Sequence, residues 1–203
     1  MRSTWLQRGG ADDLIVVFGG WALGAAPFDA LTGPQDVLFV EDWRELGALP
    51  DLSGYARRTL LAFSFGVGAA GHWIAGYGDP FDRKIAVNGT LAPADADHGI
   101  PPEMVEATAA GLSDASFARF CRRAGLDGAP QIDIAERQAE LRAVIQRGRA
   151  PDVRFDRIWL SKRDRIMPPA AMEAAWAPQS DRVEWIDAPH VPFANRLTWE
   201  AWL

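Results

Sequence analysis

The chain of 203 residues contains a single cysteine, Cys121, so no disulfide can form within it. Cysteine usage of this kind gives no indication of an oxidising compartment. The first ten residues also lack the long apolar core that a signal peptide requires. We therefore expect a cytoplasmic protein.

Positive charge is scarce as well, because 21 Lys and Arg residues stand against 27 Asp and Glu, for a net charge of -6 at pH 7. A general nucleic-acid binder needs a basic surface that displaces counterions from phosphates, so that class is not expected. No spacing of His, Cys, Asp or Glu resembles a metal site, and we expect no metal. Residues 59–78 carry no charge, but five glycines, Ser64 and His72 in this run argue against a membrane span.

Apolar residues make up 48% of the chain, which is ample for one packed domain. Short apolar runs recur with helix-like segments between them, and this alternation predicts an α/β fold with a mostly parallel sheet. Residues 14–18 are apolar at every position, as in a central strand that is covered on both faces. The expected strands are residues 4–7, 14–18, 37–40, 59–63, 84–88, 157–161 and 182–186.

The interval before the expected strand at 157–161 is too long for a single crossover. One helix is expected there after Ser113, a good N-cap residue, and before Gly125, with an apolar face at positions 117, 120, 121 and 124. A second helix is expected from about residue 133 to residue 147. We therefore predict a single domain over residues 1–203, with residues 91–152 as a helical cap insertion.

The stretch Ala62-Phe63-Ser64-Phe65-Gly66 places a small polar nucleophile between a strand-like run and a glycine-rich, helix-like run over residues 65–75. This order is typical of a nucleophile elbow, in which small residues on both sides of the serine allow a sharp strand-to-helix turn. A serine hydroxyl is a poor nucleophile unless a base takes its proton and a carboxylate orients that base.

The chain has three histidines that could supply the base. His72 lies eight residues after Ser64 on the same expected helix, or about 12 Å along its axis, which is too far for a hydrogen bond. His98 lies near the start of the expected cap. His190 follows the last expected strand, in a loop that can return over the elbow, and is the predicted base.

The acid should lie between nucleophile and base, because α/β-hydrolases carry their triad in the order Ser, Asp or Glu, His. Asp164, just beyond an expected strand, fits best. Asp95 or Asp97 is the alternative, because functional residues gather at the carboxyl ends of parallel strands. Asp187 is too close to His190 in sequence to favour the required orientation.

An acyl-transfer enzyme also stabilises the oxyanion of its tetrahedral intermediate, usually with two main-chain N–H groups. One is expected from Phe65, immediately after the nucleophile. The other is assigned to Trp21, because the preceding pair Gly19-Gly20 leaves that loop free to turn an amide inward.

A second motif overlaps the elbow, since Gly66, Gly68 and Gly71 match the G-x-G-x-x-G pattern of a dinucleotide-binding turn. That fingerprint requires an acidic residue at the end of the next strand, where residues 87–90 read Val-Asn-Gly-Thr. Close packing of the helix on the sheet explains the glycines better, and we expect no nucleotide cofactor.

Five arginines of the expected cap are candidates for substrate or partner binding. Arg119, Arg122 and Arg123 lie opposite the apolar face of the first cap helix, as a solvated surface or as a docking site for an anionic partner. Arg137 and Arg142 border the apolar stripe of the second helix and could reach a carboxylate end of a substrate.

The chain resembles a specific family over nearly its whole length. The residues that carry the resemblance are Gly19-Gly20-Trp21, Ser64-Phe65-Gly66, Asn88-Gly89-Thr90, Gly99-Ile100-Pro101, Asp164, Pro189-His190 and Pro192-Phe193. The pattern is similar to the BioG-type pimeloyl-[acyl-carrier-protein] methyl ester esterases, a compact branch of the α/β-hydrolases. Within it, Asn-Gly-Thr and Gly-Ile-Pro are the most family-specific, while Ala62 departs from the commoner glycine of the elbow.

This resemblance implies cleavage of the methyl ester from a pimeloyl chain on its acyl carrier protein, in biotin synthesis and without a cofactor. The implied roles are Ser64 as nucleophile, His190 as base, Asp164 as orienting acid, and Trp21 and Phe65 as oxyanion donors. A thioesterase or general short-acyl esterase would use the same triad, and a non-catalytic acyl-carrier-binding protein would use only the scaffold. All three functions remain open on sequence alone.

Overall fold

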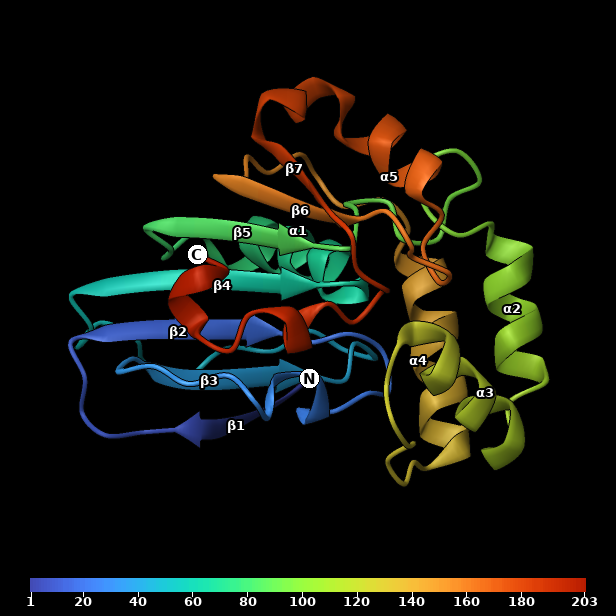
Figure 1. Cartoon of the computed structure of the whole chain (residues 1–203), viewed down its shortest axis with the longest axis horizontal. Helices are drawn as coiled ribbons and strands as arrows, with labels where there is room; N and C mark the ends of the chain where they lie inside the picture. Colours follow the sequence, from blue (N-terminus) through green and yellow to red (C-terminus); the bar gives the residue numbers. More distant parts are fainter.

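The computed structural model describes residues 1–203 and contains a seven-stranded sheet in the order β1-β3-β2-β4-β5-β6-β7 (Figure 1). Strand β1 pairs antiparallel with β3, and all the other neighbours are parallel. The strands are β1 Arg2–Gln7, β2 Asp13–Phe18, β3 Asp36–Glu41, β4 Arg57–Phe63, β5 Arg83–Val87, β6 Arg157–Ser161 and β7 Val183–Ile186. The predicted α/β fold with a mostly parallel sheet is confirmed.

Each predicted strand lies within two residues of an observed one. The continuous apolar run of β2 is buried from Leu14 to Phe18, as expected for a central strand with cover on both faces. One boundary differs for a physical reason. Asn88, which we expected to end β5, has φ +46 and leaves the strand in a left-handed conformation.

The two faces of the sheet are covered differently. Helix α1, Phe65–Tyr77, lies behind the sheet in Figure 1, whereas the C-terminal segment with the short 3-10 helices η3 (Phe193–Asn195) and η4 (Trp199–Ala201) lies in front. On that front face Phe28, within η1 (Ala26–Phe28), packs against Phe193 at 4.6 Å between ring centroids. Helix α5, Pro169–Trp176, and η2, Ala177–Arg182, connect β6 to β7.

Three helices between β5 and β6 lie beyond the carboxyl ends of the parallel strands (Figure 1): α2 Pro102–Ala110, α3 Asp114–Ala124 and α4 Ile134–Arg147. Helices α3 and α4 begin where the sequence predicted, because the side chains of Ser113 and Asp133 accept hydrogen bonds from main-chain N–H groups of the first turn. Helix α2 was not predicted as a separate element. That these helices form a cap on a single domain stays a prediction.

The core is one cluster of 51 buried apolar residues. It includes the apolar side chains of the central strands and extends to α3 and α4 through Phe117, Cys121, Leu141 and Val144. The helices are therefore packed onto the sheet rather than detached from it. None of them has the length and apolar character needed to cross a bilayer.

Candidate active site

Ser64 lies at the turn between β4 and α1, with φ +56 and ψ -127. A non-glycine residue held in this region stores backbone strain, which is common at functional turns. The turn is fixed by a 2.9 Å hydrogen bond from the Ser64 N–H to the carbonyl of Val87, and by the close approach of Gly66 to β2. A Cβ at Gly66 would overlap the carbonyl oxygen of Phe18, so only glycine fits there.

The structure brings together the three side chains that the sequence predicted as a triad. His190 Nε2 lies 3.0 Å from Ser64 Oγ, and His190 Nδ1 lies 2.6 Å from Asp164 Oδ2. Ser64 follows β4, Asp164 follows β6 and His190 follows β7, so the contact forms at the carboxyl edge of the sheet. All three residues are buried.

The surroundings of Asp164 determine which nitrogen of His190 carries the proton. Asp164 Oδ1 accepts hydrogen bonds from the N–H groups of Ile166 at 2.8 Å and Met167 at 2.9 Å. With Oδ1 occupied by these two donors, Oδ2 is left to accept from the Nδ1–H of His190. Nε2 is then free to accept the hydroxyl proton of Ser64.

Asn88 holds the loop that carries the base, His190. Its Nδ2 donates to the carbonyl oxygen of His190 at 2.7 Å and to Ser161 Oγ at 2.8 Å, and its Oδ1 accepts from the Ser161 N–H at 2.7 Å. Asn88 is 0% exposed, so each of these bonds is made away from water. Asn88 was quoted for the family resemblance but was not predicted to hold the His190 loop.

The two predicted oxyanion donors, Trp21 and Phe65, both line the pocket that contains Ser64. Phe65 is the first residue of α1, where an N–H group has no acceptor within the helix. The N–H of Trp21 makes no hydrogen bond within the chain. The loop that carries Trp21 passes close to the nucleophile, since a Cβ at Gly20 would lie 3.2 Å from the Cβ of Ser64.

The other candidate histidines and acids make contacts elsewhere. His98 Nδ1 pairs with Asp95 at 3.1 Å, and His72 Nε2 donates to the Gly148 carbonyl at 3.1 Å. Burial lowers the pKa of His72. Asp187 forms a surface ion pair of 2.7 Å with Arg163. None of these side chains contacts Ser64.

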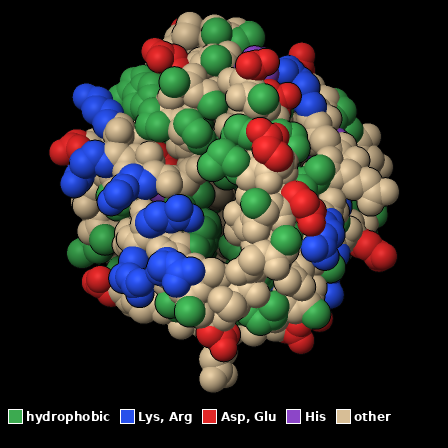
Figure 2. Space-filling view, turned by 90° about the vertical axis from the view of Figure 1, so that its right-hand side faces the viewer, with side chains coloured by type: hydrophobic (Ala, Val, Ile, Leu, Met, Phe, Trp, Pro, Cys, Tyr) green, Lys and Arg blue, Asp and Glu red, His purple; other side chains and the backbone are tan.

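A small pocket of about 110 Å³ opens above Ser64. Its lining includes the side chains of Trp21, Phe65, Ile100, Met104, Val105, Thr108, Phe120, Leu141 and Ile166, with Arg123 and Arg165 as the charged members. Figure 2 shows a hollow at this end of the molecule, with apolar side chains around it and a group of Lys and Arg side chains at one side. The pocket is suited to an uncharged chain with an anionic group outside it.

The five predicted arginines are not equivalent. Arg119, Arg122 and Arg123 are exposed on α3, as expected, but Arg123 also lines the pocket over Ser64 instead of facing only outward. Arg142 forms a surface ion pair with Glu106 at 3.1 Å. Arg137 corrects our expectation, because it is 5% exposed and does not line the pocket.

Arg137 instead forms a buried ion pair, with its Nη1 2.6 Å from Glu140 Oε2. Burial raises the pKa of Glu140 to about 7 despite the opposing charge of Arg137. Glu140 was not predicted, because nothing in the local sequence shows which charged residues of a helix face inward. The pocket residue Arg165, in the loop between β6 and α5, was not predicted either.

The glycines of the dinucleotide-like motif allow close packing of α1 against neighbouring side chains. A Cβ at Gly68 would lie 2.8 Å from Pro93, and one at Gly71 would lie 2.7 Å from Leu91. No group of His, Cys, Asp and Glu side chains is arranged to hold a metal ion. Burial raises the pKa of the Cys121 thiol to about 11, which keeps it protonated and unreactive.

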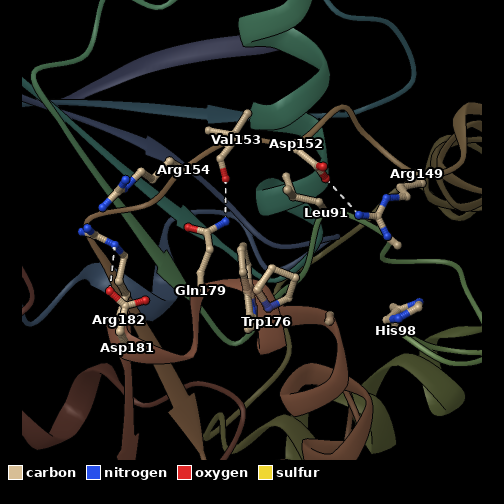
Figure 3. Close-up of a pocket in the computed structure, with 13 residues that line it drawn as sticks. Leu91, His98, Arg149, Asp152, Val153, Arg154, Trp176, Gln179, Asp181 and Arg182 are labelled. Atoms are coloured by element: carbon tan, nitrogen blue, oxygen red, sulfur yellow. Dashed lines mark hydrogen bonds and ion pairs between the residues drawn. The ribbon is translucent and has the colours of Figure 1, made fainter.

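A larger cavity of about 460 Å³ lies elsewhere, between α5 with η2 and the segment 149–154 (Figure 3). Two of its three arginines pair with acids: Arg149 with Asp152 at 2.9 Å and Arg182 with Asp181 at 3.8 Å. No triad residue lines this cavity, so its size does not make it the reaction site.

The comparisons with known proteins identify a family. A family model described as Pimeloyl-ACP methyl esterase BioG matches residues 1–202. The solved structure of BioG from Haemophilus influenzae superposes with a TM-score of 0.89 at 29% identity, over 100% of this chain and 99% of that one. A thermophilic esterase from Thermogutta terrifontis has a TM-score of 0.65 at 15% identity, over 94% of this chain and 87% of that one, which shows the fold alone.

Among curated proteins, an uncharacterized protein from Haemophilus influenzae is 30% identical over 204 residues. The match covers 94% of this chain and 94% of that protein. A malonyl-[acyl-carrier protein] O-methyltransferase from Bacteroides fragilis is 31% identical over 194 residues, or 88% of this chain. The chain spans 39% of the length of that Bacteroides protein.

Proposed function

The chain belongs to the BioG family of pimeloyl-ACP methyl esterases, and from this premise we propose that it hydrolyses the methyl ester of pimeloyl-ACP through an acyl-enzyme on Ser64. The observation that carries the proposal is the hydrogen-bonded series from Ser64 through His190 to Asp164 at the carboxyl edge of the sheet. Family membership alone specifies an esterase of the biotin pathway. The serine mechanism is inferred from the geometry.

In the first half of the reaction, the Oγ of Ser64 attacks the ester carbonyl carbon while its proton passes to His190 Nε2. The carbonyl oxygen becomes an oxyanion between the N–H groups of Trp21 and Phe65. When the tetrahedral intermediate collapses, the C–O bond to the methoxy group breaks and His190 returns the proton, so that methanol leaves. Asp164 stabilises the imidazolium that exists between these two transfers.

In the second half, water takes the place of methanol. His190 accepts a proton from the water, the hydroxide attacks the acyl-Ser64 carbonyl, and the same two amides stabilise the second oxyanion. Collapse breaks the bond to Ser64 Oγ, which regains its proton from His190. The products are a free carboxylate on the pimeloyl chain and methanol, with no change in oxidation state.

The pocket supports an uncharged ester as substrate. Its interior is lined by apolar side chains such as Phe65, Val105 and Leu141, which favour a methylene chain and a methyl ester. A carboxylate is far more costly to transfer into such surroundings than its methyl ester. The pocket therefore favours the substrate over the product acid.

The carrier protein would approach over α2 and α3. The pocket over Ser64 shares Trp21, Met104 and Phe120 with an outer groove of about 440 Å³ that also has Arg119 and Arg123 in its wall. Figure 2 shows basic side chains gathered beside the hollow. An acidic carrier protein with a phosphate on its prosthetic arm would find complementary charge at this surface.

The name of one relative is consistent with this substrate class. The Bacteroides protein is named for transfer of a methyl group to malonyl-ACP, and a methyl esterase removes a methyl group from an acyl-ACP. Because the chain spans 39% of that protein, the methyltransferase activity is not carried over to it.

The test is labelling and turnover with Ser64→Ala, using Ser180→Ala as a matched control on the exposed surface. A fluorophosphonate should label the wild type and the control but not Ser64→Ala, whose turnover should fall at least about 10³-fold. Absence of labelling in the folded wild type would favour a non-catalytic carrier-binding protein. Faster cleavage of acyl thioesters than of methyl pimeloyl-ACP would favour a thioesterase.

A further inference from the structure

Glu140 and Arg137 form a buried ion pair on α4 that no step of the reaction uses. Glu140 is 0% exposed, and its Oε2 lies 2.6 Å from Arg137 Nη1. A buried pair of this kind is weak grounds for stability, because removing both charges from water costs about as much as their attraction returns. Its contacts instead lead to the loop that carries an oxyanion donor.

The second oxygen of Glu140 holds one end of that loop through Trp43. Glu140 Oε1 accepts from the main-chain N–H of Trp43 at 3.0 Å, and the indole Nε1 of Trp43 donates to the carbonyl of Gly19 at 3.1 Å. Trp43 is 0% exposed and its ring stacks on Phe18 at 5.1 Å. The position of Gly19, where the loop begins, thus depends on a side chain that Glu140 holds.

The other end of the loop is held by Arg137. The indole Nε1 of Trp21 donates to the main-chain carbonyl of Arg137 at 3.0 Å, and its ring packs edge-on against Phe117 and Phe120 of α3. The Gly19–Trp21 loop is therefore fixed at both ends to one turn of α4. Between these ends, Gly20 passes the nucleophile at the close approach described above.

We propose that Glu140 is a positioning residue that, through Trp43 and Arg137, holds the Gly19–Trp21 loop with the Trp21 amide directed at the oxyanion. This inference rests on the proposed acyl transfer at Ser64, because it names the residue that orients one of its donors. Glu140 lines neither the pocket nor the outer groove. Its loss should therefore act on the transition state and leave substrate binding nearly unchanged.

Glutamine is the informative replacement at position 140. In its ionised form, glutamate accepts at both oxygens, one from Trp43 and one from Arg137, whereas glutamine of the same shape has a single acceptor and an NH₂ group that faces a donor. Glu140→Gln must therefore lose one of the two bonds without opening a cavity. Glu173→Gln on the exposed surface of α5 makes the same chemical change where no partner is lost.

The experiment compares wild type, Glu140→Gln and Glu173→Gln at about pH 8, where the Glu140 carboxyl is ionised. Ester turnover and hydrogen exchange of the tryptophan N–H groups are measured. A displaced oxyanion donor should lower kcat of Glu140→Gln at least about tenfold while KM changes less than about threefold. Exchange at the Trp43 N–H and at the indoles of Trp21 and Trp43 should accelerate in this variant only. Unchanged exchange, or turnover equal to that of Glu173→Gln, would overturn the proposal.

The exchange measurement needs no activity, so it separates this proposal from the proposed function. If the wild type reacts with no ester or fluorophosphonate, the serine mechanism fails, while the exchange data still decide whether Glu140 holds the loop. If Glu140→Gln does not fold, Trp43→Phe removes the indole donor to Gly19 and keeps an aromatic ring beside Phe18. That variant should show the same loss in kcat, and a wild-type kcat would overturn the proposal.

Discussion

His190 Nδ1 lies 2.6 Å from Asp164 Oδ2, and the other oxygen of Asp164 is occupied by two main-chain N–H donors. The carboxylate therefore has one orientation, with one oxygen bound to the backbone after β6 and one directed at the imidazole. This arrangement assigns the protonated nitrogen of His190 without reference to the serine.

Asp164→Asn should lower kcat about 10³- to 10⁴-fold while the fold is retained, because an amide NH₂ facing Nδ1 stabilises the wrong imidazole tautomer. Steady-state kinetics with a methyl or p-nitrophenyl ester measure the loss. The matched controls are Asp95→Asn and Asp97→Asn, the acids left open on sequence grounds. Asp95 pairs with His98 and not with His190, so a greater loss in either control would move the acid to that position.

Asn88→Ala should lower both stability and turnover. It leaves the His190 carbonyl and the Ser161 N–H buried without partners, which we expect to reduce the free energy of unfolding by about 1–3 kcal/mol. Turnover should fall further than unfolding explains, because the His190 loop loses its support. Urea denaturation and kcat are the measurements, with exposed Asn195→Ala as control. Wild-type kcat in folded Asn88→Ala would show that the loop needs no such support.

The parts of this fold that the sequence predicted are those set by local patterns. The continuous apolar run of β2 indicated a strand buried on both faces, and side-chain caps marked where α3 and α4 begin. Helix α2 was not predicted as a separate element, because it is short and its N-cap is Pro101, which has no side-chain hydrogen bond.

Some residues of the site could likewise be predicted from the sequence, and others could not. Ser64, His190 and Asp164 could be selected because chain order and strand ends restrict the choice to a few residues. Whether a charged residue of α4 faces inward depends on which distant residue packs against the helix at that point. For Glu140 that partner is Trp43, at a separation of 97 positions in the chain, and no spacing within one helix shows it.

The two glycines Gly66 and Gly76 of α1 should respond oppositely to alanine. A Cβ at Gly66 would overlap the carbonyl of Phe18, whereas one at Gly76 meets nothing within 4 Å. Gly76→Ala should therefore raise the free energy of unfolding by about 0.5–1 kcal/mol, because alanine favours the helix. Gly66→Ala should destabilise the chain and displace Ser64. Thermal unfolding distinguishes the two, and a wild-type Tm and kcat in Gly66→Ala would contradict the packing described for the elbow.

The raised pKa of Glu140 predicts a pH dependence of stability. Burial raises this pKa from 4.5 to about 7, so the folded state holds a proton there that the unfolded state releases. The contribution of Glu140 to the free energy of unfolding is fully present below pH 4.5 and is lost as the pH rises through 7. Four charged residues act on Glu140: Arg137 and Arg147 on α4, Glu41 at the end of β3 and Asp42 directly after it. All four remain in Glu140→Gln.

The measurement is the free energy of unfolding of both proteins from pH 5 to pH 8. Relative to Glu140→Gln, the wild type should lose on the order of 3 kcal/mol across this range. Because every other titrating group is common to the two proteins, their difference isolates position 140. A constant difference would mean that the carboxyl of Glu140 does not titrate in this range in the folded state.

Arg119→Glu and Arg122→Glu should impair the carrier-protein substrate more than a small ester. Both arginines are exposed on α3, and Arg119 lies in the outer groove that continues from the Ser64 pocket. Reversing a charge in a docking surface weakens association with an acidic partner, so KM for methyl pimeloyl-ACP should rise at least about tenfold and the wild-type KM should itself rise with salt. KM for p-nitrophenyl butyrate, which needs no docking, should change far less.

The control is Arg154→Glu, because Arg154 is exposed in the separate cavity of Figure 3 and the substitution reverses the same charge away from the groove. If it raises KM for the carrier substrate equally, net charge and not the α3 surface governs docking.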